Sequence, residues 1–344
     1  MKIINCFLGK SRGGIEVVAL DYADALAECG YESEILTLKK RNYTDYLIKG
    51  GHKMHYLIGR GLNPITILHF VKIVKSAKPD IVFLHGTKAV EFGTNRFVQM
   101  CCSNVKFIGV SHGVINKKYK KLKYALGIAN FLKEGLKNIG IQNTYSCQNT
   151  IRTNQTIPLL SPHSEENHIP VIGALARDSH IKGWDILFEA LGILKQKQIP
   201  FKCMVSVKKD NYEEQINRLG LDENCEFLGW VSDKEEFFKK TDLYCLPSRG
   251  EGLPLTVLEA MMYEKPVAVS DCSGSVEIVK DSKAGFVHHI GNTKQLAEQL
   301  EFLLTHPEER QTMGKNARQH ILSHFNNKDL PNRLKKIIED VYTK

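Results

Sequence analysis

The chain of 344 residues has no long hydrophobic run, no paired-cysteine motif and no recognisable nucleic-acid-binding motif. No apolar segment approaches the roughly 20 residues of a membrane-spanning helix. The strand-like segment from Met1 to Leu8 is too short for a signal peptide and lacks a small-residue cleavage site. We therefore expect a cytoplasmic protein, either free or peripheral on the cytoplasmic face of a membrane.

Cysteine chemistry is equally restricted. The nine cysteines form an odd set without a C-x-x-C spacing, which favours reduced thiols. Cys6, Cys203 and Cys245 lie within apolar, strand-like runs, where a thiol is usually a small core hydrophobe. We expect neither a metal site nor a bound cofactor.

Two phosphate-binding motifs are also missing. Gly9-Lys10-Ser11 looks like the end of a P-loop, but that motif needs a glycine at position 4, where the chain has Ile4. The G-x-G-x-x-G pattern of dinucleotide-binding proteins is absent as well. The first absence excludes a P-loop, and the second weakens the interpretation of this turn as a dinucleotide-binding site.

The chain is basic, with a formal net charge of +9. The segment from Lys117 to Tyr124 concentrates two tyrosines and five lysines, which are Lys117, Lys118, Lys120, Lys121 and Lys123. A solvated surface accounts for such a cluster. A contact with an anionic membrane surface is the alternative, because lipid headgroups attract clustered lysines. Nucleic acid is the weakest candidate, since no helix-turn-helix, zinc-finger or RNA-recognition pattern accompanies the charge.

Strand-like and helix-like segments alternate along the chain, which predicts an α/β protein with parallel sheets. The length suits two domains. We divide the chain into a domain at 1–150, a polar linker at 151–168, a domain at 169–325 and a C-terminal helix at 326–344 that could pack back on the first domain. Two such doubly wound domains would face a cleft.

The most specific segment runs from Thr241 to Met261. It reads as a buried strand at Leu243–Leu246, a polar turn carrying Glu251, and a helix beginning near Pro254 that carries Glu259. Free amides at the helix start would suit anionic or hydroxyl-rich ligands, and Glu251 would lie where open α/β sheets bind them. For Glu259 the alternative is a solvated carboxylate that the helix dipole favours near a helix start.

This segment resembles the E-x7-E signature of retaining glycosyltransferases of family 4, which have the GT-B fold of two Rossmann-like domains. The resemblance implies that Glu251 contacts hydroxyls of the transferred sugar and that Glu259 binds the ribose. It also implies that the turn places backbone amides near the sugar and phosphate through Gly252, Leu253, Pro254 and Leu255.

Further segments match the same family. Arg177 and Lys182 follow a strand and precede Gly183, which resembles the family's diphosphate-binding segment, although a solvated basic pair is the alternative. Gly13 and Gly14 resemble a G-G-x-E turn facing the donor, although a glycine turn needed only for tight strand–helix packing is the alternative. The loop that holds the nucleotide base in the family matches Gly229, Trp230 and Val231, although Trp230 could equally be a packing residue.

Two histidines end predicted strands. His112 matches a family position that contacts the donor sugar, while His85 is a weaker candidate on the acceptor side; a structural hydrogen bond is the alternative for either. One departure stands out, because Glu264 occupies a position where the family usually has glycine. If the backbone there needs a positive φ, Glu264 is strained or the helix ends differently.

The resemblance implies metal-independent transfer of a hexose-type sugar from a UDP- or GDP-sugar, with retention, to a hydroxyl acceptor. The basic segment from Lys117 to Tyr124 suggests that this acceptor is a glycan or lipid-linked molecule in bacterial cell-surface polysaccharide or lipopolysaccharide synthesis. The catalytic candidates are Glu251, His112, Arg177 and Lys182. A nucleotide-sugar 2-epimerase and a non-catalytic scaffold that binds nucleotide-sugars are the alternatives. The sequence does not name the sugar, the base or the acceptor.

Overall fold

A computed structural model describes residues 1–9, 13–39, 51–59, 61–113, 115–152 and 168–344. The chain divides into two compact units. The first contains Met1–Asn149 and Asn327–Lys344, and the second contains Thr150–Asn326. Most of the predicted linker, residues 153–167, lies outside the described residues. No described helix is long and apolar enough to cross a membrane.

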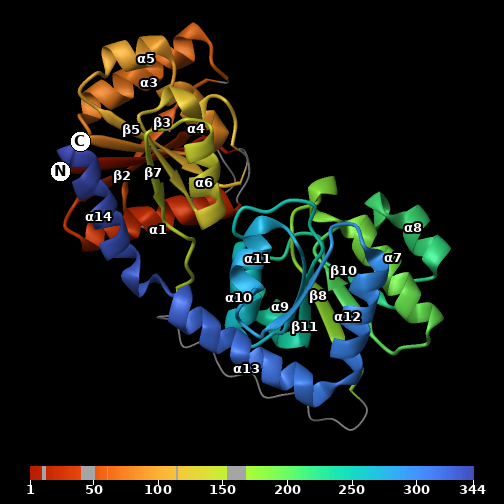
Figure 1. The fold of residues 1–344 in the computed structure, drawn as a ribbon. Coiled ribbons are helices and arrows are strands. Elements are labelled where there is room, and N and C mark those ends of the chain that lie inside the picture. The colour runs from red at the N-terminus through yellow and green to blue at the C-terminus, as the bar shows by residue number, and fades with distance from the viewer. Residues whose placement is uncertain (10–12, 40–50, 60, 114, 153–167) are drawn as a thin grey trace. The chain divides into compact units, whose positions relative to one another are not determined.

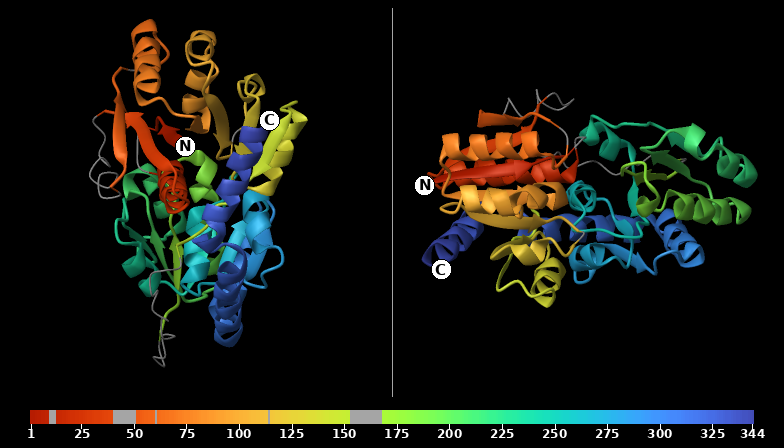
Figure 2. Two further views of the ribbon diagram at one scale, coloured as in Figure 1. Left: turned by 90° about the vertical axis from the view of Figure 1, so that its left-hand side faces the viewer. Right: turned by 90° about the horizontal axis from the view of Figure 1, so that it is seen from above.

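The first unit is built on a parallel sheet with the strand order β3-β2-β1-β4-β5-β6-β7 and helices on both faces (Figures 1 and 2). Its strands are β1 (Lys2–Phe7), β2 (Glu32–Leu38), β3 (Lys53–Leu57), β4 (Ile81–His85), β5 (Lys106–Ser111), β6 (Tyr124–Gly127) and β7 (Asn143–Ser146). Its helices are α1 (Gly14–Glu28), α3 (Pro64–Ala77), α4 (Gly86–Gly93), α5 (Arg96–Cys101), α6 (Asn130–Asn138) and α14 (Leu330–Thr343).

The second unit repeats this architecture with the strand order β10-β9-β8-β11-β12-β13. Its strands are β8 (Val171–Ala174), β9 (Lys202–Val205), β10 (Cys225–Phe227), β11 (Leu243–Leu246), β12 (Val267–Ser270) and β13 (Gly285–His288). Its helices are α7 (Trp184–Gln196), α8 (Glu213–Leu219), α9 (Lys234–Lys240), α10 (Leu255–Met262), α11 (Ser273–Val279), α12 (Thr293–Thr305) and α13 (Pro307–His324).

The central strands form because their apolar runs are buried on both faces of a sheet, as parallel sheets require. All four residues of β11 are buried, and so are residues 3–7 of β1. Every strand pair recorded within the two sheets is parallel, so the connections cross over through helices. The two doubly wound units confirm the predicted α/β class and the GT-B architecture.

Helix α14 belongs to the first unit although it ends the chain. It packs against α1, and Figure 1 shows the two helices side by side. Its buried side chains include Leu334, Ile338 and Val341. The last residues of the sequence therefore complete a core begun by the first.

Glu264 lies just after the end of α10, in a backbone conformation that glycine usually adopts. This residue has a φ of 58°, in the left-handed region that favours glycine. Its carbonyl oxygen would lie 2.1 Å from a Cβ placed on Gly314 of α13, so the backbone of the two segments is closely packed there. Arg318 of the same helix lies 3.9 Å from the Glu264 carboxylate. The turn after α10 therefore contains a residue with a strained backbone, and α13 packs against that residue.

Candidate functional site

The strand order of the second sheet reverses between β8 and β11. At such a switch point the connections leave neighbouring strands in opposite directions and open a crevice beyond the carboxyl ends, where α/β proteins bind ligands. The segment after β8 carries Arg177 and Lys182, and the segment after β11 carries Glu251. Two of the segments singled out by sequence therefore meet at one edge of the sheet.

Glu251 and Lys182 form an ion pair at this edge. The Lys182 Nζ lies 2.6 Å from the Glu251 Oε1, and both side chains are largely shielded, with exposed fractions of 15% and 7%. The hydroxyl of Ser248 donates to the same oxygen over 2.6 Å. Ser248 is itself fully buried. A carboxylate held from two sides keeps one orientation, as a group that recognises sugar hydroxyls requires.

The turn after Glu251 is shaped by close backbone packing. Gly252, Leu253 and Pro254 are buried, and Leu255 begins α10. A Cβ on Gly274, at the start of α11, would lie only 1.6 Å from the carbonyl oxygen of Gly252. Only glycine fits at position 274 without moving this turn. Gly274 was not among the predicted site residues.

Glu259 lies in the second turn of α10. Its two carboxylate oxygens accept hydrogen bonds from the Lys234 Nζ over 2.6 and 2.7 Å. Lys234 opens α9, whose N-cap Asp233 accepts a hydrogen bond from the Glu236 amide. No sequence signal points to Lys234, because a lysine at a helix start has no distinctive pattern.

Arg177 and Lys182 lie on either side of a short turn. Arg177 is exposed, and its carbonyl accepts a hydrogen bond from the Trp184 Nε1 over 3.1 Å. Gly183 has a φ of 71°, and a Cβ there would lie 2.1 Å from the Pro247 carbonyl oxygen. This glycine brings the Arg177 segment against the strand end that leads to Glu251, which explains why Lys182 can reach that carboxylate.

The predicted base-binding loop follows β10. Gly229 has a φ of 62°, and Val231 is half-buried. Trp230 is 66% exposed. The exposure argues against the alternative of a core packing residue and leaves the indole face available to a ligand.

The first sheet reverses its strand order between β1 and β4. Three side chains form a chain at this edge. The His85 Nε2 lies 3.1 Å from the Asn5 Oδ1, and the His85 Nδ1 lies 3.2 Å from the His112 Nε2. With the Asn5 oxygen as acceptor, His85 donates through Nε2 and accepts at Nδ1 from His112. The Nδ1 of His112 is then the deprotonated nitrogen, which is a hydrogen-bond acceptor.

Both imidazoles are held neutral. Burial lowers the pKa of His112 to about 3. Burial and then the proximity of His112 lower the pKa of His85 well below its usual range. Desolvation disfavours the charged form of an imidazole, so these groups act as hydrogen-bonding partners and not as cations near neutral pH. The weaker sequence candidate, His85, thus supports the stronger one.

The glycine turn of the first unit is described in part. Gly13 caps α1 with an extended φ of −164°, and Gly14 is exposed at the first helical position. A Cβ on Gly13 would lie 3.5 Å from the Glu16 Oε2, which is an ordinary contact. Lys10, Ser11 and Arg12 of the same motif lie outside the described residues.

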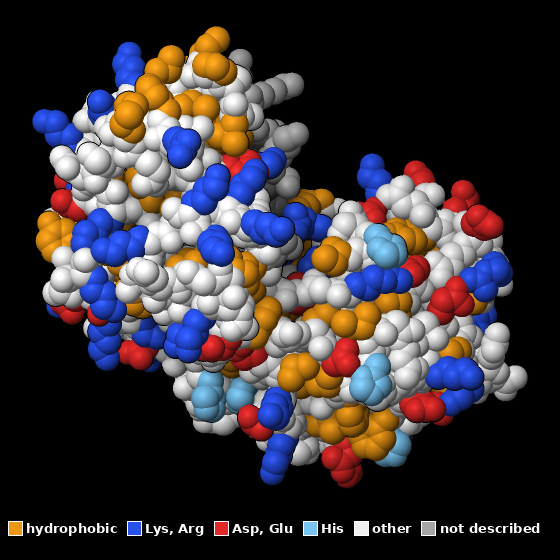
Figure 3. Space-filling model, turned by 45° about the horizontal axis from the view of Figure 1, so that its top comes forward, with side chains coloured by type: hydrophobic (Ala, Val, Ile, Leu, Met, Phe, Trp, Pro, Cys, Tyr) orange, Lys and Arg blue, Asp and Glu red, His pale blue; other side chains and the backbone are white. Residues whose placement is uncertain are grey.

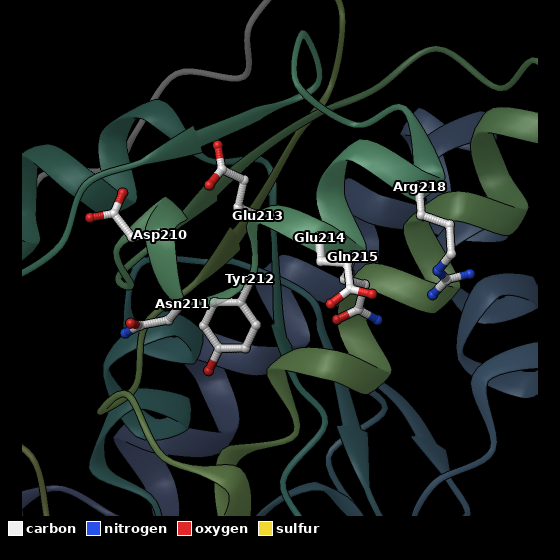
Figure 4. Close-up of a pocket in the computed structure, with 7 residues that line it drawn as sticks. All are labelled: Asp210, Asn211, Tyr212, Glu213, Glu214, Gln215 and Arg218. Atoms are coloured by element: carbon white, nitrogen blue, oxygen red, sulfur yellow. The ribbon is translucent and has the colours of Figure 1, made fainter.

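A separate surface hollow lies in the second unit (Figure 4). It is lined by residues 210–215 and by Arg218, all from one segment around the start of α8. It contains none of the predicted site residues and does not lie at a strand-order reversal. The switch-point clusters are therefore the better candidate site. Whether the predicted residues act in catalysis or donor binding stays a prediction.

Two family models match the chain. Glycosyltransferase Family 4 matches residues 12–139, and Glycosyl transferases group 1 matches residues 161–320. Between them these matches span most of both units. The chain belongs to the group 1 and family 4 glycosyltransferases, as its motifs predicted.

Sequence relatives agree with this assignment. An uncharacterized glycosyltransferase of Haemophilus influenzae is 24% identical over 90% of this chain and 92% of its own length. The lipopolysaccharide core biosynthesis mannosyltransferase LpcC of Rhizobium leguminosarum is 27% identical over 45% of this chain and 46% of its own. An Escherichia coli galactosyltransferase, whose name gives UDP-Gal and a diphosphoundecaprenol-linked GlcNAc, is 32% identical over 34% of this chain and 30% of its own.

A solved structure shows the same fold. The Anabaena protein HepE, crystallised with UDP and glucose, aligns with a TM-score of 0.83 and 18% identity. The alignment covers 99% of this chain and 100% of that one. At this identity the likeness establishes the architecture of each unit and not the ligand.

Proposed function

We propose that this protein transfers a hexose-type sugar from a UDP- or GDP-sugar to a hydroxyl of a glycan or lipid-linked acceptor. Bacterial cell-surface polysaccharide or lipopolysaccharide synthesis is the proposed setting. The observation that carries the proposal is the Lys182–Glu251–Ser248 cluster at the switch point of the second sheet. The named activities of LpcC and of the galactosyltransferase relative support the setting and the lipid-linked acceptor.

In the proposed reaction, the bond from the anomeric carbon to the diphosphate breaks while the acceptor oxygen bonds to that carbon on the same face. The acceptor proton passes to an oxygen of the departing phosphate, so the configuration is retained. Arg177 and Lys182 stabilise the negative charge on the leaving diphosphate, which is work that a metal ion does in other transferases. Glu251 binds sugar hydroxyls, Glu259 binds the ribose, and His112 accepts a hydrogen bond from the sugar.

Donor binding requires rearrangement of two ion pairs in this scheme. Lys182 and Lys234 neutralise Glu251 and Glu259 in the described structure. A donor diphosphate would draw Lys182 toward itself, while Glu251 would keep its hydrogen bond from Ser248. In this structure, Lys182, which would bind the diphosphate, is therefore paired with Glu251, which would bind the sugar.

The first test is a thermal-shift panel with UDP, GDP, ADP, CMP and their sugar conjugates, each with and without EDTA. A ligand at about 100 times its dissociation constant stabilises the folded state by about 2.7 kcal/mol. We expect one diphosphonucleotide to raise the Tm by a few degrees irrespective of EDTA, and Arg177→Ala to abolish the shift. Arg218→Ala, which removes a cation of the surface hollow, is the matched control and should leave the shift intact.

Product analysis separates the remaining functions. With the donor identified, the anomeric configuration of the product in an NMR spectrum reports retention or inversion. Turnover of the nucleotide-sugar in the absence of any acceptor would identify an epimerase instead. If the protein binds the nucleotide tightly but does not turn over the nucleotide-sugar with any acceptor tested, it is a non-catalytic scaffold.

A further inference from the structure

The outer surface of α3 and α5 in the first unit carries large apolar side chains that no described part of the chain covers. Ile65 is 79% exposed, Leu68 55%, Phe97 40% and Met100 70%. We call these four residues the α3–α5 surface. The two helices contact each other, and Figure 3 shows apolar side chains gathered over this end of the unit with lysine and arginine around them. Contiguous exposed apolar surface marks an interaction site more often than chance.

Helix α3 has a buried apolar face and an exposed face whose two halves differ in character. Its inner face packs into the core through Phe70, Val74 and Ala77. Its outer face follows the helical spacing of Ile65, Leu68, Lys72 and Lys75, all of which are exposed. The outer face is therefore apolar in the first half of the helix and basic in the second.

The charge on and near this surface is mainly positive. Residues 46–133 contain fifteen lysines and arginines but only two acidic residues, Asp80 and Glu91. No aspartate or glutamate lies on α3 or α5. Lys78 follows α3 directly, and Arg96 opens α5. An apolar surface flanked mainly by cations complements an anionic bilayer, where apolar side chains enter the interface and lysines meet the headgroups.

The lysine-rich segment identified by sequence differs from this surface. Its apolar members Tyr119, Leu122 and Tyr124 are buried in the core. The Nζ of Lys118 pairs with Glu91, and the Nζ of Lys123 donates to the carbonyl of Lys344 over 2.9 Å. The segment offers charge to a membrane but no exposed side chain that could enter it.

We propose that the α3–α5 surface docks the first unit on an anionic lipid bilayer, with its apolar side chains in the interfacial region and Lys72 and Lys75 at the headgroups. The proposal does not depend on the reaction catalysed, since docking needs neither donor nor acceptor. It would bring the first unit to a surface at which a lipid-linked hydroxyl is available.

Flotation of the full chain with vesicles tests this directly. Vesicles of phosphatidylcholine alone are compared with vesicles containing 30% phosphatidylglycerol, at low and high salt. We expect at least tenfold more protein bound to the anionic vesicles at low salt. The Ile65→Ser/Leu68→Ser/Met100→Ser variant should lose at least tenfold of this binding, and Lys72→Gln/Lys75→Gln should lose the preference for anionic lipid. Ile290→Ser, at a position 46% exposed in the second unit, should change nothing.

Two further readouts keep the test decisive. Ile65→Trp fluorescence should shift to shorter wavelength with anionic vesicles, whereas Ile290→Trp fluorescence should not. The thermal unfolding midpoint of every variant, measured without ligand, shows whether it is folded. The proposal is overturned if the wild-type chain does not float, if the serine variant floats equally well, or if only replacement of the lysines at 117–123 abolishes binding. If the serine variant floats equally well but loses self-association that the wild-type chain shows, the surface is instead an interface between copies of this chain.

Discussion

At the scale of single residues, Ser248 is the side chain whose role is most sharply defined by its contacts. Its hydroxyl donates to Glu251, while its carbonyl accepts a hydrogen bond from the Cys272 Sγ over 3.0 Å and another from the Ser270 hydroxyl. The neighbouring strand end thus fixes Ser248, and Ser248 fixes Glu251. Because the serine is buried, it orients the carboxylate without being available to contact a substrate.

We expect Ser248→Ala to lower kcat about tenfold, the equivalent of one hydrogen bond to a charged group. The nucleotide dissociation constant should stay nearly unchanged, because Arg177 and Glu259 are untouched. Ser248→Thr retains the hydroxyl and should recover part of the rate. The control is Ser282→Ala, another buried serine, whose hydroxyl donates to the Val279 carbonyl. Equal losses in both alanine variants would contradict a specific role for Ser248.

The site residues that could be predicted from the sequence lie in segments with a recognisable motif. Glu251, Lys182 and Gly183 belong to segments with a recognisable order of strand, turn and helix, and the structure brings Glu251 and Lys182 together. Lys234 was not predicted because its contact with Glu259 joins segments 25 residues apart that share no pattern. The Asn5–His85 contact joins residues 80 positions apart. Such partners are determined by how elements distant in sequence pack together, which single-sequence patterns do not specify.

At the scale of elements, the end of α10 combines a strained residue with close packing. A non-glycine residue in the left-handed region costs roughly 1 kcal/mol or more. We expect Glu264→Gly to raise the free energy of unfolding of the second unit by about 0.5–1 kcal/mol. Urea denaturation followed by circular dichroism measures this difference.

Glu264→Ala is the informative comparison, because it keeps the strain and removes the contact with Arg318. This variant should be no more stable than the wild type, and less stable by up to about 1 kcal/mol if the partly shielded ion pair contributes. If alanine stabilised the unit as much as glycine does, strain at position 264 would not be the cause.

The central strands were predictable because they are continuous apolar runs, and β11 was predicted to the residue. The strands β3, β7 and β13 were not predicted. Each of the three lies at an edge of its sheet, and most of their residues are only half-buried. Edge strands are buried on fewer sides, so their sequences are more polar and carry a weaker signal.

At the scale of the whole molecule, the chain leaves the first unit after Asn149 and returns to it at Asn327. The returning helix α14 buries Leu330, Leu334, Ile337, Ile338 and Val341. Burial of each such side chain contributes about 1.5–3 kcal/mol, which together is comparable with the stability of a domain. The first unit therefore depends on residues that are distant in sequence.

Deletion of residues 327–344 should unfold the first unit selectively. We expect hydrogen exchange to show loss of protection in β1, β4 and β5, while β8, β11 and β12 stay protected. Deletion of Lys344 alone, which removes an exposed residue paired with Asp340, serves as the control and should leave both units protected. Simultaneous loss of protection in all six strands would show instead that the two units fold as one.

The returning helix also has a consequence for synthesis on the ribosome. Translation delivers the first 149 residues long before α14, and the whole second unit emerges in between. The second unit can fold while the nascent chain is still growing, but the first must wait for its closing helix until residues 327–344 have been synthesised. During that interval the apolar face of α1 awaiting α14 is open to chaperones. Synthesis that stopped before residue 327 would then yield a polypeptide whose second unit is folded and whose first unit is incompletely folded and open to degradation.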